Sequence, residues 1–179
     1  MLFRSGILAD DSLGFDALQP EIGPLIRAAL DELIASRRRE GEKLAEMILG
    51  RIRHMRELVA TVQPRVPALV AEYQEKLATR LRDAAATLDE DRIRLEVGLF
   101  AQRVDVAEEL SRLSTHLDEV ERILKAGGSA GKRLDFLMQE LNREANTLGS
   151  KAMAADMTAV AVDLKLAIEQ MREQVQNIE

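Results

Sequence analysis

One short segment of the chain carries four residues at helical spacing whose side chains can do chemistry: Asp105, Glu109, Arg112 and His116. Successive members are four, three and four residues apart, which places them along one stripe of an α-helix. Carboxylate oxygens and an imidazole nitrogen on one face can hold a divalent cation or support general acid and base catalysis. A solvated face laced with ion pairs between helical turns gives the same pattern, and no HExxH or other metal motif decides between the two.

A second polar stripe with the same spacing follows further along the chain: Gln139, Arg143, Asn146 and Ser150. Charged residues flank this stripe, namely Arg133, Glu140, Glu144 and Lys151. Asparagine is unfavourable inside a helix. The stripe therefore indicates either a functional surface or the fraying end of a helix near Gly149.

A basic cluster stands earlier in the chain: Arg37, Arg38, Arg39, Lys43, Arg51, Arg53, His54 and Arg56. Arginine and lysine side chains of this kind can bind phosphate groups. Glutamates are interleaved with them, at positions 40, 42, 46 and 57, so ordinary surface charge is the alternative. The sequence has no glycine-rich phosphate loop, no serine–histidine–aspartate order and no dinucleotide-binding fingerprint.

Long helices must position these side chains. A first helix is expected to start at Pro20 or Pro24, because proline suits a first helical turn, and to run for roughly 40 residues until Pro64 and Pro67 close it. A second helix begins near Pro67 and ends before a turn at residues 87–90. The first of these helices carries the basic cluster, and neither of them carries a polar stripe.

Both polar stripes fall on helices that come later. A third helix is expected over 90–125, and its apolar residues from Val106 to Leu124 alternate steps of four and three. Such a heptad-like seam suits packing against another long helix. A glycine-rich break at 126–131 ends this helix. A fourth helix starts near Lys132, and a last apolar stretch continues to the C-terminus.

The predicted fold class is all-α: long antiparallel helices in a bundle or hairpin of four to five helices, with the long first helix packed against the third. Of the 179 residues, 46% are hydrophobic and only 3% aromatic, and β-branched residues nowhere alternate over a strand length. All four prolines fall within the first 67 residues, so nothing after them forbids long helices. We expect residues 1–19 to be a linker or the remnant of a missing domain, and 20–179 to form the helical domain.

Composition excludes several classes of protein. The chain has no cysteine, which removes disulfides, zinc–thiolate sites and thiol catalysis. Its net charge of −6 argues against a protein that coats nucleic acid without specificity, although a local basic patch is still allowed. No apolar run approaches the ~20 residues of a membrane span. The apolar stretch at the start is too short for a signal peptide, so we expect a cytoplasmic protein without membrane contact.

Four segments make the sequence recognisable. They are RRREGEKL (Arg37–Leu44), AQRVDVAEELSRLSTHLDEV (Ala101–Val120), GKRLDFLMQELNREANTLGSK (Gly131–Lys151) and DLKLAIEQMREQVQNIE (Asp163–Glu179). Together they resemble the YicC/YloC family of bacterial endoribonucleases, over about Pro20 to Glu179. The first of them contains the Arg-x-x-Glu-Gly-x-x-Leu pattern of that family.

The resemblance implies the all-helical C-terminal region of a longer protein, whose N-terminal domain carries β-structure and is missing from this chain. The segment Gly6–Ile7–Leu8–Ala9 resembles the join between the two regions. The family further implies metal-dependent cleavage of RNA, with Mn or Mg as the divalent cation, and association with RNA-decay enzymes. It also implies a ring-like homo-oligomer, with six subunits as the expected number in the full-length protein.

RNA cleavage needs a cation or a general base near the phosphate, and further cations that neutralise charge. On this hypothesis the expected catalytic residues are Asp105, Glu108, Glu109, His116, Glu140 and Glu144. The cation ligands among them are Asp105, Glu109, Glu140 and Glu144. RNA is expected to be bound by Arg39, Arg112, Arg133, Arg143, Asn146 and Lys151. Convergence of the four ligands in one concave site would favour an enzyme.

The competing hypothesis is a non-catalytic helical module for oligomerisation, or an adaptor in an RNA-decay complex. The heptad-like seams and the acidic net charge favour it, and dispersal of the four carboxylates over a convex surface would support it. Apolar residues on the far flank of the predicted helices are in turn expected to meet another subunit. Examples are Leu95, Leu99 and Phe100.

Overall fold

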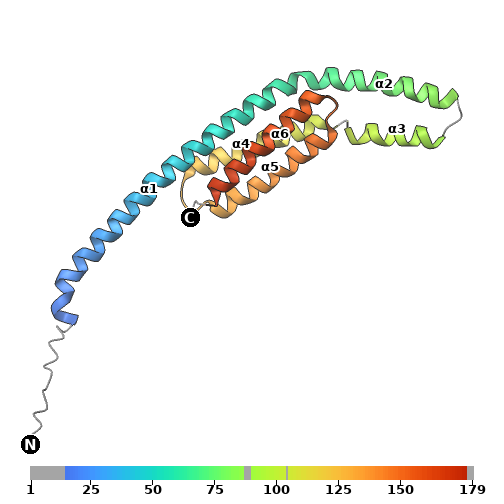
Figure 1. The fold of residues 1–179 in the computed structure, drawn as a ribbon. Coiled ribbons are helices and arrows are strands. Elements are labelled where there is room, and N and C mark those ends of the chain that lie inside the picture. The colour runs from blue at the N-terminus through green and yellow to red at the C-terminus, as the bar shows by residue number, and fades with distance from the viewer. Residues whose placement is uncertain (1–14, 87–89, 104, 177–179) are drawn as a thin grey trace, which may run out of the picture. The chain divides into compact units, whose positions relative to one another are not determined.

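The fold is all-α in the part of the chain that the computed structural model describes, residues 15–86, 90–103 and 105–176 (Figure 1). Within these ranges there are six α-helices, one short 3-10 helix and no strand. They are α1 (Phe15–Val62), η1 (Gln63–Arg65), α2 (Val66–Ala86), α3 (Glu90–Arg103), α4 (Val106–Ala126), α5 (Gly131–Lys151) and α6 (Ala155–Val175). The predicted fold class is therefore confirmed, and the expected four to five helices become six because the third of them is interrupted.

Helix α1 begins earlier than predicted. It starts at Phe15, and both Pro20 and Pro24 lie inside it. An internal proline removes one backbone donor, clashes with the preceding turn and costs a helix about 3 kcal/mol, although most residues on either side of the two prolines are tolerated well in a helix. The expected linker at 1–19 is thus helical from Phe15 onwards, and the rest of it, residues 1–14, lies outside the described part.

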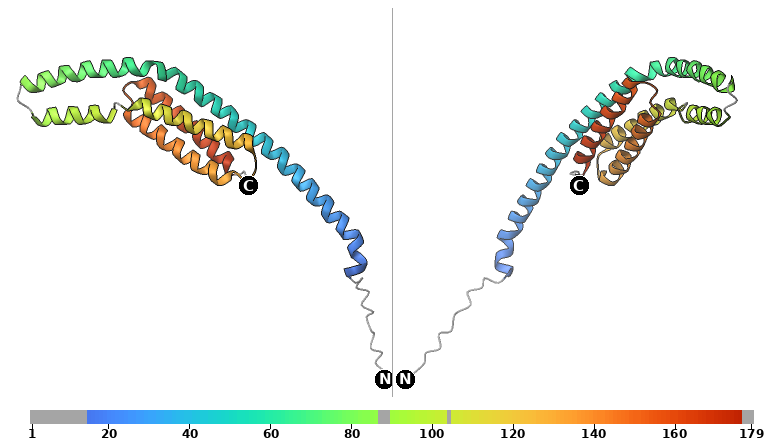
Figure 2. Two further views of the ribbon diagram at one scale, coloured as in Figure 1. Left: turned by 180° about the vertical axis from the view of Figure 1, so that it is seen from behind. Right: turned by 45° about the vertical axis from the view of Figure 1, so that its right-hand side comes forward.

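Two compact units divide the chain, Met1–Glu42 and Lys43–Glu179. In the second unit, α4, α5 and α6 lie side by side with the Lys43–Val62 part of α1 (Figures 1 and 2). Each helix turns one apolar stripe inwards, and together the stripes form the core. Its fully buried side chains include Ile52, Leu113, Leu117, Leu141 and Leu164. The seam predicted for the third helix is the buried face of α4.

Ion pairs join the second-unit part of α1 to α4. Arg56 forms salt bridges with Asp118 and Glu121, both at 2.6 Å. Hydrogen bonds from Lys125 and Arg56 lower the pKa of Glu121. The predicted packing of the first helix against the third is therefore confirmed for the Lys43–Val62 part of α1.

Two short connections make α4, α5 and α6 antiparallel. The first is the predicted glycine-rich break, where Gly127 and Gly128 have φ of 67° and 83°, a left-handed conformation that glycine adopts without steric strain. The second connection, residues 152–154, contains neither glycine nor proline. Ala154 there is extended, with φ −143° and ψ 154°. The predicted fourth helix and the last apolar stretch are therefore separate elements that fold back on each other.

Helices α2 and α3 form a further antiparallel pair. The rings of Tyr73 and Phe100 stack with their centroids 6.0 Å apart, and Arg80 pairs with Glu96 at 3.3 Å. The single third helix predicted over 90–125 is wrong, because α3 packs on α2 whereas α4 packs on α5. One straight helix cannot bury its stripe against two partners that lie in different places.

The large apolar side chains exposed on the α2–α3 pair are those of Leu95 and Val97. Of the residues expected to meet another subunit, Leu95 is exposed, whereas Leu99 and Phe100 are partly covered within the chain. Among the described residues, no helix is both long and apolar enough to cross a membrane.

Candidate metal centre

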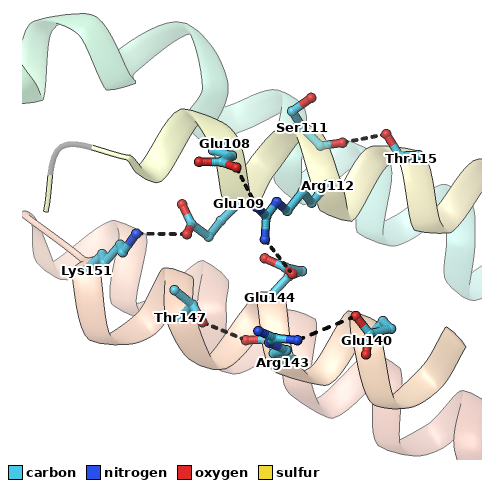
Figure 3. Close-up of polar contacts among 10 residues, drawn as sticks. All are labelled: Glu108, Glu109, Ser111, Arg112, Thr115, Glu140, Arg143, Glu144, Thr147 and Lys151. Atoms are coloured by element: carbon cyan, nitrogen blue, oxygen red, sulfur yellow. Dashed lines mark hydrogen bonds and ion pairs between the residues drawn. The ribbon is translucent and has the colours of Figure 1, made fainter. Parts of the chain in front are cut away.

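Polar side chains that flank the buried seams of α4 and α5 meet across the interface between these two helices (Figure 3). Three ion pairs mark the antiparallel register: Glu109 with Lys151, Arg112 with Glu144, and Glu119 with Arg133. As residue numbers rise along α4, the numbers of their partners fall along α5. Each side chain of α4 therefore reaches only a short stretch of α5, and this decides which of the expected site residues can converge.

His116, Glu140 and Glu144 are the metal-ligating side chains that converge in the described part of the chain. One ligand atom from each lies within 4.8 Å of the other two. Glu140 and Glu144 stand on successive turns of α5, and His116 belongs to α4. The Glu144 side chain is only 4% exposed, whereas 26% of the Glu140 side chain is exposed. The group is thus closed at Glu144 by the helix interface and open to solvent at Glu140.

Arg112 lies between two carboxylates of different helices, as Figure 3 shows. Its Nη2 donates to Glu108 Oε1 at 2.5 Å, and its Nη1 lies 3.6 Å from Glu144 Oε1. The hydrogen bond to Glu108 raises the pKa of Arg112, with smaller contributions from the charges of Glu144 and Glu109. Half of the arginine side chain is exposed. Arg112 therefore compensates the charge of the buried Glu144, while its own side chain remains accessible to solvent.

Arg143 has a similar arrangement within α5. Its Nη1 lies 4.0 Å from Glu140 Oε2, and 71% of its side chain is exposed. Its backbone carbonyl accepts a hydrogen bond from Thr147 Oγ1 at 3.0 Å. Both carboxylates of the converging group consequently have an arginine beside them that solvent can reach.

Glu109 and Lys151 form a pair of a different kind. Lys151 Nζ lies 2.9 Å from Glu109 Oε1, and their side chains are only 19% and 6% exposed. The other oxygen, Glu109 Oε2, is buried without a hydrogen-bond partner. A buried charge is costly unless an opposite charge compensates it. Lys151, which was expected to bind RNA, is therefore engaged in the helix interface.

The four expected cation ligands are not brought together as one group. Glu140 and Glu144 converge, but Glu109 pairs with Lys151 and Asp105 is exposed just before α4. At a rise of ~1.5 Å per residue, Asp105 lies about 16 Å along the helix axis from His116, which is too far for side chains to bridge. Glu109 is only three residues from Arg112, which contacts Glu144, so its pairing with Lys151 and not axial distance keeps it out of the group.

His116 was expected to be catalytic but not to be a ligand, and the structure places it level with Glu140. A pattern in the sequence could have predicted that His116 and Glu140 lie at the same level of the two helices. Two antiparallel helices joined by the short connection at 127–130 bring together residues that are equally far from that connection. His116 and Glu140 are nearly so, and the same reasoning excludes Asp105.

The residues expected to bind RNA are distributed unevenly. Arg112 and Arg143 flank the converging group, and Arg133 is exposed further along the same helix pair, beside Glu119. Asn146 is exposed and donates to the side chain of Asn142 at 3.2 Å. Arg39 is exposed on the part of α1 that belongs to the Met1–Glu42 unit.

The chemistry of the converging side chains fits a divalent cation. An imidazole nitrogen with two carboxylate oxygens suits a first-row cation such as Mn²⁺, whereas Mg²⁺ prefers oxygen donors and water. The guanidinium of Arg112 lies 3.6 Å from Glu144 Oε1, which is longer than a charge-assisted hydrogen bond of about 2.7–2.9 Å. Glu144 thus retains the capacity to ligate a cation.

Comparison with known proteins identifies relatives of this chain. A family model described as "Endoribonuclease YicC-like, C-terminal" matches residues 62–179. A protein of Haemophilus influenzae named probable endoribonuclease YicC is 46% identical over 174 residues, which are 97% of this chain and 61% of that protein. A Clostridioides difficile protein of the same name is 35% identical over 167 residues, 92% of this chain and 57% of that protein. The chain therefore spans less than two thirds of the length of either relative.

Proposed function

Since this chain belongs to the family of YicC-like endoribonuclease C-terminal regions, we propose that it is the cation-binding helical part of an RNA-cleaving enzyme. His116, Glu140 and Glu144 are the cation ligands, and Arg112 and Arg143 bind phosphate. One observation carries the proposal: an imidazole and two carboxylates from two helices have ligand atoms within 4.8 Å of one another. The names of the relatives support RNA as the substrate.

A divalent cation in this group would act as a Lewis acid on a phosphodiester oxygen and lower the pKa of a bound water. Glu144 is buried in the helix interface, so its carboxylate is held in place by packing. Glu140 stands at the solvent edge, where its carboxylate can accept a proton from an approaching water. The exposed guanidinium groups of Arg112 and Arg143 can bind non-bridging phosphate oxygens through paired donors.

The proposal gives a different part to the other carboxylates of α4. Glu108 holds Arg112 at 2.5 Å and so positions a phosphate-binding residue. Glu109 stabilises the helix interface through Lys151. Asp105 has no part in the ligand set.

RNA cleavage by the purified chain in Mn²⁺ or Mg²⁺, repeated after addition of a chelator, tests the proposal. We expect Glu144→Gln to lower cleavage at least about tenfold, as loss of a cation ligand should. Calorimetric titration with Mn²⁺ gives a second readout that needs no cleavage, and the same variant should bind Mn²⁺ more weakly.

Glu119→Gln is the matched control, because it removes a carboxylate from the same helix pair, beside Arg133 and outside the converging group. This variant should keep the cleavage rate and the Mn²⁺ affinity of the wild type, and circular dichroism should show unchanged helix in both variants. Wild-type cleavage and wild-type Mn²⁺ affinity in both Glu144→Gln and His116→Ala would remove the group from the reaction.

A second candidate function, the non-catalytic oligomerisation module, is favoured by a separate observation. The first unit exposes an apolar seam on α1, here called the α1 seam: Ile22, Leu25, Ile26, Leu30, Leu33 and Ile34 are 36% to 70% exposed. Glu21 stands at the start of the seam, Asp31 and Glu32 lie within it, and arginines follow it at positions 37 to 39. Antiparallel pairing of two copies about the middle of the seam would bring Glu21 of one copy near the arginines of the other.

We therefore propose a second copy of the chain as the occupant of the α1 seam. The family resemblance adds a ring of subunits and RNA-decay enzymes as partners. A chain that self-associates but neither binds Mn²⁺ nor cleaves RNA would support the module alone. Loss of both cleavage and Mn²⁺ binding in Glu144→Gln would support the enzyme.

A further inference from the structure

Each carboxylate of the converging group has an arginine beside it. The arginine supplies the positive charge that a bound cation would otherwise supply. Arg112 Nη1 lies 3.6 Å from Glu144 Oε1, and Arg143 Nη1 lies 4.0 Å from Glu140 Oε2. Both arginine side chains are at least half exposed, while the two carboxylates are far more covered. In Figure 3, dashed lines join the guanidinium group of Arg112 to Glu144 and that of Arg143 to Glu140.

The two contacts compensate charge without completing strong hydrogen bonds. A charge-assisted hydrogen bond has a donor–acceptor distance of about 2.7–2.9 Å, and both arginine–carboxylate distances exceed this. Arg112 has its short contact elsewhere, with Glu108 at 2.5 Å. It can therefore leave Glu144 and remain anchored on α4.

We propose that Arg112 and Arg143 are counter-cations that neutralise Glu144 and Glu140 when no divalent cation is bound, and that they turn to RNA phosphate when a cation occupies the carboxylates. This inference rests on the proposed function, because it assigns a second state to the same site. Arg112 is the principal member, since its partner Glu144 is the more deeply buried carboxylate. The two arginines are positioning residues that couple the cation to RNA.

Thermodynamic linkage gives the consequence. In the free protein Arg112 competes with a cation for Glu144, so removal of its charge should strengthen cation binding. In the RNA complex the cation frees Arg112 for phosphate, so cation and RNA should each strengthen the binding of the other by the same factor. Removal of Arg112 should abolish most of that mutual gain.

The experiment uses the 179-residue chain, Mn²⁺ alone, and the variant Arg112→Gln, with free Mn²⁺ measured by electron paramagnetic resonance. We expect the variant to bind Mn²⁺ several-fold to about tenfold more tightly than the wild type, because one nearby positive charge is lost. Arg122→Gln is the matched control. Arg122 stands on the same helix, but it pairs with Glu119 at 2.6 Å, so this variant should bind Mn²⁺ like the wild type.

A second arm measures RNA binding by fluorescence anisotropy with a labelled 2′-O-methyl oligoribonucleotide, with and without Mn²⁺. Mn²⁺ should tighten binding by the wild type and by Arg122→Gln, and clearly less by Arg112→Gln. Unchanged or weaker Mn²⁺ binding in Arg112→Gln, beside a wild type that binds Mn²⁺ and a Glu144→Gln variant that does not, would overturn the coupling and leave the proposed site intact. Equal Mn²⁺ binding by wild type and Glu144→Gln would overturn the proposed site itself, and the coupling with it.

Discussion

Glu109 and Glu144 are the two charged residues that are buried in the described part of the chain, and their side chains are 6% and 4% exposed. Their chemistry is identical, but their partners differ. Glu109 has a lysine at 2.9 Å, whereas Glu144 has an arginine at 3.6 Å and two further ligand-type side chains beside it. Glu109 already has an opposite charge within hydrogen-bond distance of one of its oxygens, whereas the charge beside Glu144 lies 3.6 Å away. Partner geometry, more than residue type, therefore separates a structural carboxylate from a candidate ligand.

We predict that Lys151→Met lowers the free energy of unfolding by about 3 kcal/mol, because it leaves Glu109 buried and unpaired. Urea denaturation followed by circular dichroism measures this. The double variant Lys151→Met with Glu109→Leu should regain most of the loss, since replacing both members of a buried pair by apolar residues is often neutral.

The control for this prediction is Lys125→Met. Lys125 pairs with Glu121 at a similar distance, 2.6 Å, but its side chain is 68% exposed, and exposed pairs contribute at most about 1 kcal/mol. If Lys151→Met cost no more than this control, the buried pair would have no special part in the helix interface.

Sequence reasoning found the helix faces of the site but not its register. The stripes placed His116 on one helix and Arg143 beside Glu140 and Glu144 on the next, as in the structure. Residues on one stripe of a helix can lie far apart along its axis. Asp105 was therefore grouped with His116, although His116 lies about 16 Å further along the axis. The partner helix decides which of them can converge, and burial of individual carboxylates depends on it as well. Neither property can be read from residue type and spacing on a single helix.

At the scale of elements, apolar seams predicted the helices well and some of their ends poorly. The end of α4 was predicted because Gly127 and Gly128 follow it, and their positive φ explains why glycine is needed. The end of α3 has no such marker. Asp105 and Glu108 resemble a capping box, yet Asp105 makes no side-chain cap hydrogen bond. The interruption there follows from packing on different partners, which is a tertiary cause.

Two glycines of the α4–α5–α6 bundle should respond to the same substitution with opposite signs. A Cβ added at Gly149 would meet Ala161 Cβ at 3.5 Å, an ordinary contact, so Gly149→Ala should stabilise the protein by up to about 1 kcal/mol. Gly127 has φ 67° and ψ −168°, which other residues rarely adopt, so Gly127→Ala should destabilise it by about 1–3 kcal/mol.

Thermal and urea unfolding of the two glycine variants provide an internal control, because both substitutions restrict the unfolded chain equally. Destabilisation by Gly149→Ala would show that α5 and α6 approach too closely there for a methyl group.

At the scale of the whole molecule, apolar surface is divided unequally between the two units. The second unit buries its seams in one core, whereas the first unit exposes the α1 seam. Contiguous exposed apolar patches on soluble proteins mark interaction sites. Helical spacing of the apolar residues in the first helix was visible in the sequence, but spacing alone does not tell whether a seam is covered. That information came from the exposed fractions of its side chains.

We predict that Leu30→Glu weakens self-association of the 179-residue chain. Leu30 lies within the α1 seam and is 52% exposed, and pairing of two copies would force a buried, unpaired charge into the interface. Phe136→Glu is the control, because Phe136 is 57% exposed but lies on α5, outside the seam.

Sedimentation velocity over a range of concentrations should show a smaller species for Leu30→Glu alone. Added salt should weaken association of the wild type in part, since antiparallel pairing brings Glu21 of one copy near the arginines at positions 37 to 39 of the other. A wild type that stays monomeric at high concentration, or equal behaviour of the two variants, would contradict a second copy as the occupant of the seam.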